Sequence, residues 1–84
     1  MTTEKPTPTP RNLSGPRIAL ARIAHHPAMS QAKLSKRLAK KGIYLDQGII
    51  SRIENQDRGV PDIELVAIAH CLHVSVAWLC GEKG

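Results

Sequence analysis

Polar side chains that carry paired hydrogen-bonding groups gather between residues 47 and 52. Gln47, Ser51 and Arg52 occur there around Gly48, within a segment that also carries three isoleucines. A glutamine amide can bond adenine at two positions, an arginine guanidinium can bond guanine at two, and a serine hydroxyl accepts or donates to any base. The chemistry that these residue types offer is therefore recognition of hydrogen-bonding edges.

Residue patterns typical of catalysis or metal binding are missing from the sequence. It has no glycine-rich phosphate loop, no His-Glu-x-x-His and no Cys-x-x-Cys. His70, Cys71, His73 and Cys80 are the only group with metal-ligand chemistry, and their spacing matches structural zinc sites poorly. We therefore expect no enzymatic activity, no metal and no cofactor, with both cysteines as reduced thiols.

The middle third of the chain is positively charged, whereas the last third is negatively charged. The 84 residues have a formal net charge of +5; residues 28–58 carry a balance of +4 and residues 59–84 a balance of −2. A local positive potential of this kind fits a polyanion-binding face. The length allows one small domain, and no apolar run approaches the roughly 18 residues of a membrane span. The first residues lack the apolar core of a signal peptide, so we expect a cytoplasmic protein with no membrane contact.

Helix signals divide the chain into a Thr/Pro-rich arm at residues 1–13, a helical domain at 14–81 and a short tail at 82–84. The arm has almost nothing to bury and is expected to be disordered. Ser14, Ser30, Asp46 and Ser75 are predicted helix N-caps, and Asp62 is predicted to begin a further helix. Gly42 is a predicted C-terminal stop. The pattern predicts an all-α fold with five helices and no strand.

Apolar spacing predicts which side of each helix faces the core. Because side chains one turn apart share a helix face, Leu34 and Leu38 form the buried stripe of the second helix. The complete inward set is Ile18, Ala21, Ile23, Ala24, Leu34, Leu38, Ile49, Ile50, Ile53, Ile63, Leu65, Val66, Ala67, Ile68, Ala69, Leu72, Val76, Trp78 and Leu79. Gln47, Gly48, Ser51 and Arg52 are left facing solvent or a ligand.

Four blocks of the sequence, taken in order, resemble one known family. They are Met29-Ser30-Gln31-x-x-Leu34, Ile50-Ser51-Arg52-Ile53-Glu54-Asn55, the segment 62–69, and Leu72-x-Val74-Ser75-Val76-x-Trp78-Leu79. Together they resemble the helix-turn-helix family of phage Cro proteins and repressors, also called the xenobiotic-response-element family. The resemblance covers residues 16–81. It implies a five-helix lambda-repressor-like domain that inserts helix 46–55 into the DNA major groove.

The resemblance also implies roles for individual residues. Gln47, Gly48, Ser51 and Arg52 would read bases, while a second set would contact the DNA backbone: Ser30, Gln31, Lys33, Asn55 and Arg58. Arg22 and Glu54 resemble a pair that forms an internal salt bridge in such domains. Dimers of this family bind two half-sites, and the residues expected at a homodimer contact are Val74, Val76 and Ala77.

The sequence departs from the family pattern at several points. The connections at residues 25–29 and 39–46 are longer than the commonest form, which leaves the relative angle of the second and third helices open. Gly48 stands where a long polar side chain is usual, Ser35 replaces alanine at a tight helix contact, and Gln56 stands where glycine commonly follows asparagine.

The leading hypothesis from the sequence is a sequence-specific, double-stranded DNA-binding transcriptional regulator, most simply a repressor acting as a homodimer at the nucleoid. The alternative is an antitoxin or protein-interaction module that uses the same helical fold to bind a protein partner. A thiol or metal sensor that uses Cys71 and Cys80 is the third reading.

Overall fold

Five helices make up the regular structure of the part of the chain that the computed structural model describes, residues 9–82. They are α1 (Gly15–Ala24), α2 (Gln31–Ala39), α3 (Gln47–Glu54), α4 (Asp62–Leu72) and α5 (Val76–Leu79), and no strand occurs in this range. The expectation of an all-α fold with five helices is confirmed. The expected arm lies mostly at residues 1–8, outside the described residues.

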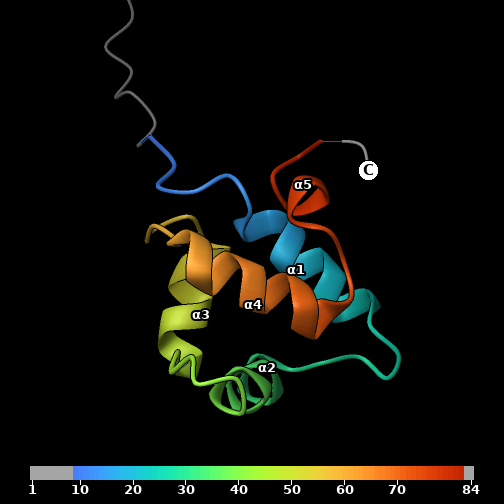
Figure 1. Cartoon of the computed structure of the whole chain (residues 1–84). Helices are drawn as coiled ribbons and strands as arrows, with labels where there is room; N and C mark the ends of the chain where they lie inside the picture. Colours follow the sequence, from blue (N-terminus) through green and yellow to red (C-terminus); the bar gives the residue numbers. More distant parts are fainter. Residues whose placement is uncertain (1–8, 83–84) are drawn as a thin grey trace, which may run out of the picture.

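The helices pack around one core of aliphatic side chains (Figure 1). Helix α1 contacts α3, α4 and α5, while α2 contacts α3 and α4, so α1 and α2 lie on different sides of a shared centre. The most deeply buried large side chains have exposed fractions of at most 2%. They come from every helix and from the α1–α2 connection: Ile18, Met29, Leu34, Leu38, Ile50, Ile53, Ile68 and Leu79. The core therefore fixes α3 from its apolar side.

Helix boundaries follow the predicted caps at three of the four N-termini. The side chains of Ser30, Asp46 and Ser75 accept hydrogen bonds from backbone N–H groups three residues later. Ser14 occupies the N-cap position of α1 but makes no capping hydrogen bond, and the N–H of Gly15 instead donates to Asn12 Oδ1 at 2.8 Å. The predicted N-cap position of Ser14 is confirmed, but its side chain does not cap α1, because the side chain of Asn12 accepts from the first N–H group of the helix instead.

Four residues that were predicted to face inward lie on the solvent side of their helices. The exposed fractions are 64% for Ile23, 69% for Ile63 and 42% for Val66, and Ala24 is exposed as well. At about 100° per residue, Ile23 falls on the opposite side of α1 from the buried Ile18. Helices α1 and α4 therefore carry apolar residues on both their buried and their solvent sides.

Gly15 lets α1 approach α3 more closely than any other residue could. It is buried, and a Cβ added there would meet the carbonyl oxygens of Ile53 and Glu54. The N-terminus of α1 therefore lies directly against the C-terminal turn of α3.

Candidate nucleic-acid interface

Helix α3 buries one side and presents the opposite side to solvent. Its N-terminus is fixed by Asp46 Oδ1, which accepts from the N–H of Ile49 at 2.8 Å. Ile50 and Ile53 are 1% exposed. The predicted base-reading residues lie on the other side: Gln47, Gly48 and Arg52 are exposed and Ser51 is half-buried. This helix has therefore no freedom to rotate without exposing its isoleucines.

An ion pair between α1 and α3 fixes the end of α3. Arg22 Nε lies 2.8 Å from Glu54 Oε2, and Arg22 Nη2 lies 3.0 Å from Oε1, as the resemblance implied for these two residues. The side chains are 14% and 7% exposed. Hydrogen bonding to Glu54 raises the pKa of Arg22, and burial opposes this effect only in part. The guanidinium therefore stays charged and bidentate on Glu54.

The same ion pair also holds the start of α2. Arg22 Nη1 donates to the carbonyl oxygen of Met29 at 2.9 Å, and the N–H of Met29 donates to the carbonyl oxygen of Arg22 at 3.0 Å. Gln31, the first residue of α2, donates through Nε2 to Glu54 Oε1 at 3.0 Å. Glu54 thus connects α1, α2 and α3, and the amide of Gln31, predicted to contact a DNA phosphate, braces α3.

The connection between α2 and α3, which the sequence left open, is fixed at its middle. Ser35 Oγ donates to the carbonyl oxygen of Leu45 at 2.6 Å, and Leu45 itself is 3% exposed. The hydroxyl of Ser35 therefore anchors the α2–α3 connection to α2. Tyr44, next to Leu45, is 80% exposed.

The loop after α3 turns back on itself at Gln56, whose φ is +63°. Gln56 therefore adopts the left-handed conformation that glycine adopts more easily. Arg58, a predicted backbone contact, forms an ion pair with Glu64 of α4, with Nη1 2.8 Å from Oε1. Asn55, the other predicted contact of this loop, is the exposed C-cap of α3.

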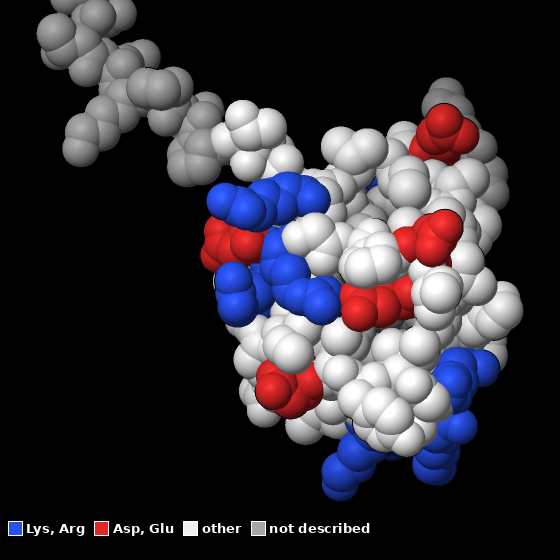
Figure 2. Space-filling model, turned by 60° about the vertical axis from the view of Figure 1, so that its left-hand side comes forward, with Lys and Arg blue, Asp and Glu red and all other residues white. Residues whose placement is uncertain are grey.

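Basic side chains occupy two separate parts of the described surface. Figure 2 shows Lys and Arg beside the point where the chain enters the folded body, and again at the lower edge, where α2 lies. The α2 group surrounds a shallow hollow on the solvent side of that helix: Lys33, Lys36, Arg37 and Lys40. Of these, only Lys33 belongs to the first turn of α2, beside Ser30 and Gln31.

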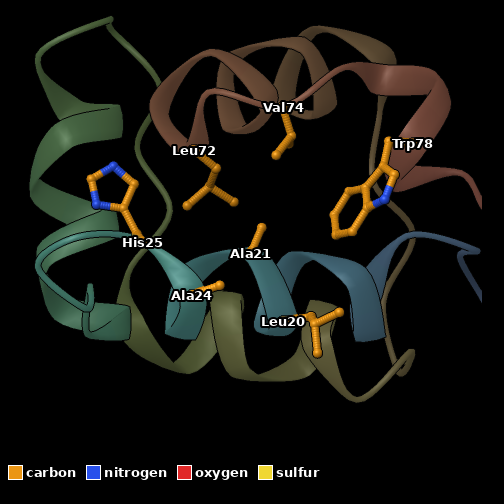
Figure 3. Close-up of a pocket in the computed structure, with 7 residues that line it drawn as sticks. All are labelled: Leu20, Ala21, Ala24, His25, Leu72, Val74 and Trp78. Carbon is orange, nitrogen blue, oxygen red and sulfur yellow. The ribbon is translucent and has the colours of Figure 1, made fainter. Parts of the chain in front are cut away.

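A shallow apolar groove of about 260 Å³ lies between α1 and the C-terminal segment (Figure 3). Leu72, Val74 and Trp78 form one wall and face Ala21 of α1, while Ala24, Leu20 and His25 complete the lining. The predicted dimer residues Val74, Val76 and Ala77 are half-buried rather than fully exposed. Leu20, at 59% exposure, and Ile23, which was predicted to face inward, leave more apolar surface free.

The two thiols lie in different surroundings and are not bonded to each other. Cys71 is buried and Cys80 is half-buried. Burial raises the pKa of Cys71, and the nearby positive charges of Lys41 and Arg37 lower it to a smaller extent. Among residues 9–82, no three His, Cys, Asp or Glu side chains come close enough to hold a metal ion.

Two further features emerge only from the three-dimensional arrangement. Arg17 places its guanidinium carbon 4.8 Å from the centre of the Trp78 ring and donates to the Trp78 carbonyl oxygen, which ties α5 to α1. Arg11 and Asn12, assigned to the disordered arm, are hydrogen-bonded to the loop after α3. Their partners are more than forty residues away in the sequence, so no local pattern could have indicated them.

Comparison with protein-family models, with curated proteins and with solved structures found no match. No helix of the described residues has the length and apolar character needed to cross a membrane. The fold and the site together define a small all-helical domain that presents one rigidly held helix with a polar outer side.

Proposed function

We propose that this chain is a sequence-specific, double-stranded DNA-binding transcriptional regulator with a lambda-repressor-like fold. In this proposal, α2 and α3 form a helix-turn-helix, α3 enters the major groove, and the chain acts as a repressor by occupying an operator. The observation that carries the proposal is the outer side of α3, where Gln47, Ser51 and Arg52 surround Gly48 while Ile50 and Ile53 hold the helix in the core.

The bracing of α3 supports a reading role for that outer side. Base readout needs a helix whose side chains reach fixed positions, because a bidentate hydrogen bond tolerates little displacement. Glu54 receives hydrogen bonds from Arg22 and Gln31 and so fixes the C-terminal turn of α3. Asp46 and the Ser35–Leu45 hydrogen bond fix its N-terminal end. Gly48 offers no side chain, so Gln47, Ser51 and Arg52 carry the readout.

Contacts to the phosphate backbone supply most of the affinity in this proposal. The N-terminus of α2, with Ser30, Gln31 and Lys33, offers N–H groups, an amide and a cation to one phosphate strand. Asn55 and Arg58 contact the phosphate backbone of the DNA at the other end of α3. Arg58 is paired with Glu64 at the surface, so a phosphate would compete with this carboxylate for the guanidinium.

We propose a homodimer on DNA, because one small domain reads only a few base pairs and two half-sites add their free energies. Val74, Val76 and Ala77 remain the proposed contact. Val74 lines the apolar groove together with the exposed Leu20, so a second copy seated at Val74 would also cover that surface.

The test is selection of bound duplexes from a random pool, followed by binding measurements from roughly 50 mM to 200 mM salt. With about four to six phosphates contacted per dimer, log K should fall against log salt with a slope of roughly −4 to −5. The selected site should have two-fold symmetry. Binding without salt dependence, or no binding at the lowest salt, would contradict the proposal and leave a protein-interaction module as the remaining hypothesis.

The same experiment separates base reading from charge. Arg52→Ala should weaken binding to the selected duplex by about 1–3 kcal/mol and relax the preference at one or two base pairs, because a bidentate contact to guanine is lost. Equal losses on matched and mismatched duplexes would assign Arg52 to the backbone instead.

A further inference from the structure

The side chain of Asn12 fastens the segment before α1 to the end of α3. Its Nδ2 donates to the carbonyl oxygens of Ile53 at 2.9 Å and Arg58 at 2.7 Å. Its Oδ1 accepts from the N–H of Gly15 at 2.8 Å. One half-buried amide therefore joins the last turn of α3, the following loop and the start of α1. Replacing it would leave backbone carbonyl groups without partners.

Gln56 completes this fastening from the other side. Its side-chain Nε2 donates to the carbonyl oxygen of Asn12 at 2.9 Å, and its own carbonyl oxygen accepts from the N–H of Arg11 at 3.0 Å. These two bonds pair residues 11–12 with the left-handed residue of the loop. They explain why a glutamine is accommodated in a conformation that favours glycine: its side chain makes a contact that glycine lacks.

The consequence is that the backbone of Arg11 is held beside the C-terminal end of α3. Asp57, the residue after Gln56, donates its N–H to the carbonyl oxygen of Arg52 at 2.8 Å. The backbones of Arg11 and Arg52 are therefore hydrogen-bonded to two successive residues, Gln56 and Asp57. Both guanidinium groups are exposed, and neither has an ion-pair or hydrogen-bond partner among residues 9–82. Arg58 is attached to the same segment through Asn12. Figure 2 shows Lys and Arg side chains, with acidic side chains beside them, close to where the chain enters the folded body.

We propose that Arg11 is a phosphate-binding residue of the DNA interface, and that Asn12 and Gln56 are the residues that position it beside Arg52 and Arg58. This inference rests on the proposed function. The backbone bonds Arg11–Gln56 and Arg52–Asp57 hold two unpaired guanidinium groups on linked segments, and a phosphate oxygen is the ligand that best matches their planar donors. Arg11 comes from the segment before α1 rather than from α3, so it meets the DNA backbone and carries no base preference.

The test compares Arg11→Ala with Lys40→Ala, on the selected duplex and on a duplex of unrelated sequence. Lys40 is the matched control because its exposed cation lies on the solvent side of α2, and both substitutions remove one positive charge. Arg11→Ala should weaken binding to both duplexes by about fivefold and make the salt slope shallower by about one, whereas Lys40→Ala should do neither. Equal effects of the two variants would overturn the assignment, because net charge alone would then explain them.

The positioning role is tested through Gln56→Gly. Glycine adopts a φ of +63° without strain, which offsets the lost side-chain hydrogen bond, so the unfolding midpoint should change little. Binding should weaken by about threefold with Arg11 present and by no further factor in the Arg11→Ala background. Additive effects of the two substitutions would overturn the positioning role.

The outcomes for Arg11 and for the function as a whole are separable. If the unsubstituted chain binds DNA with the expected salt slope and Arg52→Ala weakens it while Arg11→Ala does not, only the assignment of Arg11 fails. If the unsubstituted chain shows no salt-dependent binding, the proposed function fails and the assignment of Arg11 fails with it.

Discussion

Two arginine–glutamate ion pairs of the same length hold different parts of this molecule. Arg22–Glu54 and Arg58–Glu64 both have a nitrogen–oxygen distance of 2.8 Å. The first pair joins residues 32 positions apart and its side chains are 14% and 7% exposed, whereas the second joins residues 6 positions apart with exposures of 29% and 19%. The two pairs have equal distances but should contribute differently to the stability of the fold.

The difference lies in the additional partners of each pair. Arg22 also binds the carbonyl oxygen of Met29, and Glu54 also binds Gln31, so the first pair connects three helices. Arg58 adds only the carbonyl oxygen of its neighbour Gly59, and its second nitrogen lies 3.5 Å from Glu64. The first pair is part of the framework that holds α3. The second joins only the loop after α3 to α4, so its loss should change the fold little, and under the proposed function a phosphate would replace Glu64 as the partner of Arg58.

The largest effect should come from removing Glu54. Glu54→Ala leaves Arg22 largely buried without its counter-charge and frees the amide of Gln31, so the free energy of unfolding should fall by about 3 kcal/mol. Urea unfolding followed by circular dichroism measures this loss. Glu64→Ala is the matched control, with an expected loss of about 0.5 kcal/mol because an exposed pair contributes little. Equal losses in the two variants would contradict the comparison.

An intermediate effect is expected for Gln31→Ala. It removes one hydrogen bond to the Glu54 carboxylate and leaves the Arg22–Glu54 pair in place, so the free energy of unfolding should fall by about 1 kcal/mol. Under the proposed function, DNA affinity should fall to the same extent on matched and mismatched duplexes, since a phosphate carries no base identity. A selective loss on the matched duplex would instead make Gln31 a base-reading residue.

The smallest effect should come from Glu64→Gln. It removes the carboxylate that competes with phosphate for Arg58, so DNA affinity should rise by about threefold while stability changes by less than about 0.5 kcal/mol. Glu82→Gln, which makes the same charge change at an exposed position beyond α5, is the control and should raise affinity less. If the two variants behave alike, Arg58 is not an exchangeable backbone contact.

Local features of the fold were predictable because they depend on residues close in the sequence. Ser30, Asp46 and Ser75 cap their helices as expected, since a cap joins a side chain to a backbone group three residues away. Ile23, Ile63 and Val66 were misassigned because α1 and α4 are apolar on more than one side, and spacing alone does not say which side another helix covers.

Contacts of the site between segments far apart in the sequence differed in whether they could be predicted. The Arg22–Glu54 pair was expected only because a resemblance supplied it. The contacts of Asn12 with Ile53 and Arg58 follow from how the loop after α3 turns, and this turn depends on the conformation of Gln56. Neither composition nor periodicity encodes that conformation, so the sequence placed Arg11 in the arm.

Gly15 has a consequence for how far this sequence can diverge while it keeps the same shape. Most exposed positions of the proposed interface can be exchanged without a change in the fold, because their side chains extend into solvent. Position 15 has no such freedom, because any side chain would push α1 away from the carbonyl oxygens of Ile53 and Glu54. Substitutions elsewhere on the surface would not relieve this constraint. We therefore expect related sequences with the same fold to keep a glycine here, although the residue has no part in the proposed DNA contacts.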